Sequence, residues 1–172
     1  MERECDAPML DAETRLGSYP PDHRDELRLW LRLLTCATLI EGEIRTRLRA
    51  RFDVTLPRFD LMAQLEKSPE GLTLGELSRR MMVSNGNITG LVERLVESGH
   101  ITRVPHPTDR RIAYVKLTEA GHLAFVTMAH EHADWIGSLF SGLPPADARA
   151  LLLLLGQLKQ SVRDAAARDG AA

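Results

Sequence analysis

Aromatic residues and cysteines are scarce in this chain of 172 residues. Phe, Trp and Tyr make up 5% of it, and the two cysteines are Cys5 and Cys36. Two cysteines cannot form a disulfide framework, and they lack the spacing of a zinc site. Leu, Ala and Arg abound instead, and such unbranched side chains lose little rotamer freedom in a helix. The composition therefore predicts a mainly α-helical protein from a reducing compartment.

Long apolar runs and a secretory leader are also missing. The longest apolar run, around residues 151–155, is far shorter than the roughly 20 residues that a membrane-spanning helix needs. The acidic residues at the start of the chain do not match the basic and apolar stretches of a secretory signal. We therefore expect a cytoplasmic protein without a membrane partner.

The sequence contains none of the common short motifs of enzymes. There is no Gly-rich phosphate loop, no Gly-x-Ser-x-Gly and no His-Glu-x-x-His. His130 and His132 are two residues apart, so on a helix they point about 200° apart and cannot hold one metal ion. We expect a protein that is not an enzyme and that uses no cofactor or metal.

Charge is distributed unevenly along the chain. The formal net charge is −2, yet residues 72–117 contain seven Lys and Arg against four Asp and Glu, which gives +3 there and −5 in the rest. A basic middle between acidic ends is typical of a phosphate-binding module carried on a separate scaffold.

Apolar spacing and turn residues predict six helices and one β-hairpin. Thr73 and Glu76 have the spacing of a capping box, and Ser84 is a candidate N-cap. The expected helices cover residues 22–51, 57–67, 74–80, 85–98, 119–140 and 146–167, and the expected strands cover 101–104 and 112–117.

Three regions follow from this pattern. Residues 1–20 have no periodicity and are interpreted as a mobile N-terminal arm. Residues 21–56 together with 119–168 are predicted to form a helical dimerisation region, because one chain of this size could hardly bury such broad apolar faces alone. Residues 57–118 are predicted to form a DNA-binding lobe.

Two short helices joined by a tight turn and followed by a hairpin with a basic tip are the order of a winged helix-turn-helix. In that fold the second helix enters the major groove, where Asn matches the edge of adenine, and a wing arginine can enter a narrow minor groove. The partner is then double-stranded operator DNA. The predicted DNA-binding residues are Thr73, Ser84, Asn85, Asn87, Thr89, Arg94, Arg103, Asp109, Arg110 and Arg111.

Residues 71–80, 83–84, 91–95, 109–111 and 117–121 resemble the MarR family of regulators. The resemblance implies a homodimer formed by the first and last helices, and a ligand pocket between these helices and the DNA-binding lobe. The sequence departs from the family pattern at His106 and at Asn85-Gly86-Asn87, which concerns the operator sequence rather than the activity.

Residues 34–41 and 84–90 are similar to MarR-family regulators of aromatic-acid catabolism, some of which respond to hydroxycinnamoyl-CoA thioesters. This similarity implies a repressor that a small aromatic acid or its CoA thioester releases from the operator. The candidate ligand-binding residues are Arg45, Arg49, Phe59 and Met62. Arginines 45, 47, 49 and 51 have a second interpretation, as a solvated helix end.

Several residues have two interpretations from sequence alone. Cys36 lies on an apolar stripe, so it fits the core of the protein better than an oxidant sensor. Met62, Met81 and Met82 either fill an irregular core or line a pliable pocket. A winged helix can also serve protein contacts, although the wing arginines would then have no purpose.

Overall fold

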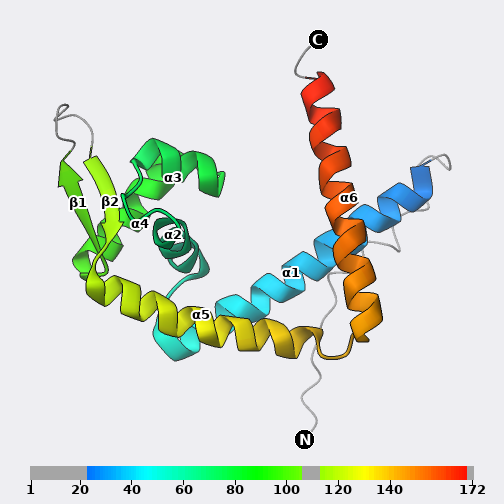
Figure 1. Cartoon of the computed structure of the whole chain (residues 1–172), viewed down its shortest axis with the longest axis horizontal. Coiled ribbons are helices and arrows are strands. Elements are labelled where there is room, and N and C mark those ends of the chain that lie inside the picture. The colour runs from blue at the N-terminus through cyan, green and yellow to red at the C-terminus, as the bar shows by residue number, and fades with distance from the viewer. Residues whose placement is uncertain (1–22, 106–112, 170–172) are drawn as a thin grey trace, which may run out of the picture. The chain divides into compact units, whose positions relative to one another are not determined.

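The computed structural model describes residues 23–105 and 113–169, so the predicted mobile arm over 1–20 lies outside the described residues. Within them the chain forms six helices and a two-stranded hairpin, which confirms the mainly α-helical fold (Figure 1). The elements are α1 (Arg24–Phe52), α2 (Leu56–Glu66), α3 (Leu74–Met81), α4 (Asn85–Glu97), β1 (Ile101–Pro105), β2 (Ala113–Leu117), α5 (Glu119–Phe140) and α6 (Pro145–Asp169).

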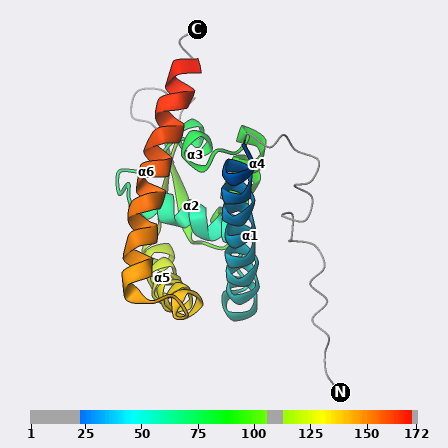
Figure 2. The same ribbon diagram turned by 90° about the vertical axis from the view of Figure 1, so that its right-hand side faces the viewer.

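The chain divides into two compact units, one up to His132 and one from Ala133 onward. The first unit has its own apolar core, in which each buried side chain is worth about 1.5–3 kcal/mol. Its members come from every helix and strand between α1 and α5: Ile44, Leu48, Phe59, Leu61, Met62, Leu65, Leu72, Leu77, Ile88, Val92, Leu95, Ile101, Val115 and Met128. Within this unit α3 lies beside α4 in both Figure 1 and Figure 2.

A short turn with a side-chain hydrogen bond joins α3 to α4. Met82 ends α3 in the left-handed conformation, with φ of 54°, and the Ser78 hydroxyl donates to the Val83 carbonyl at 2.6 Å. The Met82 side chain is 92% exposed, whereas Met62 is 1% exposed. Of the two interpretations of the methionines, core filling therefore holds for Met62 and not for Met82.

The hairpin is antiparallel, with Ile101 opposite Leu117 and Pro105 opposite Ala113. Leu72, just before α3, pairs with Val115 through backbone hydrogen bonds of 3.0 and 2.8 Å. This bridge joins the hairpin to the start of α3.

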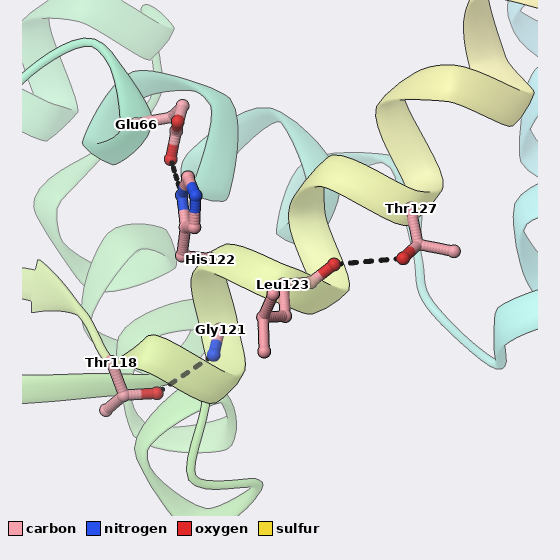
Figure 3. Close-up of polar contacts among 6 residues, drawn as sticks. All are labelled: Glu66, Thr118, Gly121, His122, Leu123 and Thr127. Carbon is pink, nitrogen blue, oxygen red and sulfur yellow. Dashed lines mark hydrogen bonds and ion pairs between the residues drawn. The ribbon is translucent and has the colours of Figure 1, made fainter.

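Thr118 positions the start of α5 directly after β2. Its hydroxyl donates to the Gly99 carbonyl at 2.7 Å. The same hydroxyl accepts from the Gly121 N–H at 3.0 Å (Figure 3). The Thr118 N–H donates to the His100 carbonyl at 3.0 Å. The base of the hairpin is therefore attached to the first turn of α5.

The second unit consists of α6 and the end of α5, and α6 contains no buried residue among those described. Leu152, Leu153 and Leu154 are 73%, 69% and 61% exposed. Residues 29–39 of α1 also include exposed apolar side chains, namely Leu29, Trp30, Leu34 and Leu39. The predicted boundaries of the dimerisation region and the DNA-binding lobe stay a prediction.

The sequence prediction for Cys36 was wrong. Cys36 lies on α1 but is exposed, because the described residues of the chain do not cover the apolar side of this part of the helix. Helical periodicity identifies an apolar face without identifying what covers it.

Within the described residues, no helix has by itself the length and apolar composition needed to cross a membrane. In the same part of the chain, α5 and α6 meet these criteria together, as a sharply bent pair.

Candidate nucleic-acid interface

The start of α4 presents polar side chains to solvent. Ser84 is the N-cap, and its hydroxyl accepts from the Asn87 N–H at 3.4 Å. Asn85 and Asn87 are exposed, while Ile88, the residue directly after Asn87, is fully buried. Because the apolar face is held by the core, the first turn is free to enter a groove with its two amide side chains foremost.

Two predicted DNA-binding threonines already have partners within the protein. The Thr73 hydroxyl donates to Glu76 Oε2 at 2.8 Å and accepts from the Glu76 N–H at 3.2 Å, which completes the capping box. The half-buried Thr89 donates to the Asn85 carbonyl at 3.0 Å. A DNA contact by either hydroxyl stays a prediction and would have to use a remaining acceptor position.

The predicted basic contacts are placed unequally. Arg94 on α4 and Arg103 on β1, opposite Val115, are exposed. The wing residues Asp109, Arg110 and Arg111, together with His106, lie outside the described residues. The structure thus describes the base of the wing, where Arg103 lies, beside α4. The role of the tip, which carries Asp109, Arg110 and Arg111, stays a prediction.

The capping box gives Glu76 a pH-dependent role. The pKa of its carboxyl lies below the ordinary value of 4.5, because the Thr73 N–H and then the Thr73 hydroxyl donate to it, with smaller contributions from Arg79 and Arg80. A carboxyl with a lowered pKa in the folded state stabilises the fold above its unfolded pKa. That contribution is lost as the pH falls through the lowered value.

Thr73→Ala is expected to lower the free energy of unfolding by about 1 kcal/mol near neutral pH, because α3 loses its N-cap. The loss should shrink at acidic pH, once the pH lies below the lowered pKa of Glu76 and the carboxyl is protonated in both proteins. Urea unfolding at the two pH values measures both effects. Thr127→Ala is the control, since Thr127 is an exposed mid-helix residue that caps nothing. An equal loss at both pH values would contradict the role of Glu76.

The candidate ligand-binding residues lie in different surroundings. Arg45 is paired with Glu41 at 2.8 Å, and Arg49 lies 3.9 Å from Asp53. Phe59 and Met62 are buried in the core. Both arginines are more than half exposed, as in a solvated helix end, so a ligand anion would compete with these carboxylates.

Sequence reasoning missed the residues around Phe59. Its ring centroid lies 5.5 Å from that of Phe125 and 5.1 Å from that of His132, both on α5. Next to it, desolvation and then the Glu41 carboxylate raise the pKa of Asp60, while His132 lowers it. Phe125 and His132 follow Phe59 by 66 and 73 positions, so no local spacing could have brought these rings together.

A second missed contact lies between α2 and α5. His122 Nδ1 is 2.8 Å from Glu66 Oε2, and Figure 3 shows the two side chains pointing toward each other. Glu66 ends α2, where the helix dipole disfavours a carboxylate, and the His122 ring gives this carboxylate a hydrogen-bond partner. This pair holds the end of α2 against the first turns of α5.

A tight helix-turn-helix, an exposed polar first turn on its second helix and a hairpin directly after it define a winged helix-turn-helix protein. Residues 52–112 match the family model described as MarR family. The crystal structure of a MarR family transcriptional regulator from Silicibacter pomeroyi is similar, with 30% identity and a TM-score of 0.71 over 84% of this chain and 99% of that one. The chain belongs to the MarR family.

Two further relatives extend this comparison. The transcriptional activatory protein BadR of Rhodopseudomonas palustris is 32% identical over 104 residues, which are 59% of this chain and 59% of BadR. A mutant MarR from E. coli, crystallised with operator DNA, has a TM-score of 0.68 over 81% of this chain and 99% of that one. At its 23% identity the likeness shows the fold alone. These relatives are transcriptional regulators and not enzymes.

Proposed function

We propose that this chain is a transcriptional repressor that binds double-stranded operator DNA as a homodimer and is released by a small aromatic acid or its CoA thioester. The observation that carries DNA binding is the start of α4, where Ser84 caps the helix and Asn85 and Asn87 are exposed. The relative crystallised with operator DNA has the same fold, which supports this use of α4.

The homodimer is supported by apolar surface that one chain leaves exposed. Large exposed apolar patches on a protein usually mark an interaction surface. Leucines 151–155 on α6 and residues 29–39 of α1 carry such side chains. A dimer also presents two recognition helices, which must lie about 34–36 Å apart to enter successive major grooves.

The wing is tested by Arg110→Ala. We expect this variant to bind operator DNA more weakly by about 1–3 kcal/mol, with a shallower salt dependence, because a guanidinium is lost from the minor groove. Fluorescence anisotropy with a duplex from upstream of the chain's own gene, at several salt concentrations, measures both quantities. Circular dichroism should show unchanged helical content. The wing does not touch DNA if Arg110→Ala and Arg111→Ala both match the parent at every salt concentration.

The effector is tested by linkage. A ligand held near Arg45, Arg49, Phe59 and Met62 releases DNA only if it binds the DNA-free form better. Phenolic acids or their CoA thioesters should therefore lower operator affinity about 5–150-fold, the span of a coupling of about 1–3 kcal/mol. Titration into the anisotropy assay measures this. If calorimetry detects no binding of any of these compounds, the aromatic effector is wrong while DNA binding is unaffected.

The direction of regulation needs a separate measurement, since the similar BadR is named an activatory protein. We expect a reporter gene behind the operator to be transcribed more when the chain is deleted. Lower transcription after deletion would make the chain an activator, and the binding measurements would stand.

A further inference from the structure

The start of α2 and the start of α4 converge on one surface hollow in the first unit. Its volume is about 370 Å³. The N-cap and first turn of α2, the turn before α4 and the first three turns of α4 form its walls. The lining residues are Thr55, Pro57, Arg58, Val83, Gly86, Asn87, Gly90, Leu91 and Arg94.

The hollow is lined by two cations and by no carboxylate. The guanidinium groups of Arg58 and Arg94 have no hydrogen-bond or ion-pair partner among the described residues. By contrast, Arg45 and Arg47 on α1 are paired with acids at 2.8 and 2.7 Å. Two unpaired guanidinium groups around a concave surface are suited to an oxyanion, which they can bind in a bidentate way.

Two glycines leave the wall of the hollow without side chains. Gly86 and Gly90 lie one turn apart on α4, and a Cβ added to either would meet nothing within 4 Å. Glycine weakens a helix interior relative to alanine, and no packing contact of the described residues requires it here. Because Gly86 and Gly90 have no side chains, a ligand can approach the helix backbone closely at these positions.

We propose that this hollow seats a backbone phosphate of the operator DNA, bound by Arg58 and Arg94 beside the backbone of Gly86 and Gly90. The inference rests on the proposed function, because it requires the first turn of α4 to enter the major groove. The phosphates of the duplex line the rim of that groove, so one of them comes next to the flank of the helix. Arg58 and the start of α2, which sequence reasoning did not assign to DNA, thereby join the interface.

The first test is Arg58→Ala. Its affinity for a duplex from upstream of the chain's own gene should fall about tenfold or more, because a charge-assisted hydrogen bond is lost. The slope of log affinity against log salt should become shallower by about 1, as for any lost phosphate contact, and a random duplex should show the same change. Lys67→Ala is the matched control. It removes one positive charge at the other end of α2 and should leave the slope unchanged.

The second test separates a DNA contact from a folding effect. Gly90→Ala should raise the thermal midpoint by about 2–4 °C, because alanine favours the helix and has open space around it. The same variant should bind the duplex more weakly, since the added methyl group occupies the place of the phosphate. A more stable variant with weaker binding is the result that the proposal requires, and unchanged affinity in a stabilised variant would overturn it.

The remaining outcomes distinguish a DNA phosphate from a free oxyanion as the ligand of the hollow. They also distinguish failure of this inference from failure of the proposed function. If inorganic phosphate binds the wild type and not Arg58→Ala, while both bind the duplex equally, the hollow serves a free oxyanion and the proposal is wrong. If the wild type binds the duplex and Arg58→Ala matches it in affinity and slope, this inference alone fails. If the wild type binds no duplex at all, the proposed function fails together with it.

Discussion

Leu154→Asp is expected to halve the mass of the protein in solution and to abolish specific operator binding. Leu154 is 61% exposed on α6 within one chain, next to Leu152 and Leu153, which are exposed still further. In a symmetric dimer each substitution occurs twice, so two carboxylates would be placed in an apolar contact at a cost of several kcal/mol each. A monomer carries one recognition helix and loses the paired half-site contacts.

Sedimentation at micromolar concentration tests this expectation. The wild type should sediment at about twice the chain mass of 19.2 kDa, and the variant at the chain mass. Lys159→Asp is the matched control, because it places the same side chain on the same helix at a position that is already charged and exposed. A wild type that is monodisperse at 19.2 kDa would refute the dimer, and a dimeric Leu154→Asp would exclude this face as the interface.

The second large effect is expected at Gly121, in the first turn of α5. A Cβ at this position would lie 1.8 Å from the His100 carbonyl oxygen and 2.7 Å from the His100 carbonyl carbon. That carbonyl accepts the Thr118 N–H, so it cannot move aside without breaking the contact that joins the hairpin to α5. Gly121→Ala should lower the free energy of unfolding by at least about 3 kcal/mol, the upper range for overpacking.

Urea unfolding followed by circular dichroism measures this loss. The control is Gly90→Ala, also a glycine within a helix, which should gain about 1 kcal/mol because its surroundings are open. The close approach of α5 to His100 would be wrong if Gly121→Ala were as stable as the wild type.

The sequence by itself determined the elements of this protein and their order. Thr73 with Glu76, Ser84 and Pro57 begin helices at the expected places, because a cap or a first-turn proline acts over three or four residues. Gly99, with φ of 73°, follows the end of α4 as expected, since glycine adopts this conformation without strain. The same local signals carried the resemblance to the MarR family.

The local sequence of a helix does not determine which part of the protein packs against its apolar face. Cys36 fitted an apolar stripe and is nevertheless exposed, because burial depends on a covering surface that the helix does not encode. Thr73 and Thr89 are suitable residues for DNA contacts, yet both hydroxyl groups have partners inside the protein. The capping-box spacing predicted the partner of Thr73, whereas the partner of Thr89, the Asn85 carbonyl, was not predicted.

Only the tertiary structure decided which distant residues meet. It stacked Phe59 on Phe125, paired Glu66 with His122 and placed Gly121 against His100. It also brought Arg58 of α2 to the same hollow as Arg94 of α4. Such contacts join positions that are 20 to 70 residues apart, and they form because the core of the first unit closes around α2 and α4. Their geometry depends on packing across the whole core, whereas caps and turns depend on a few neighbouring residues.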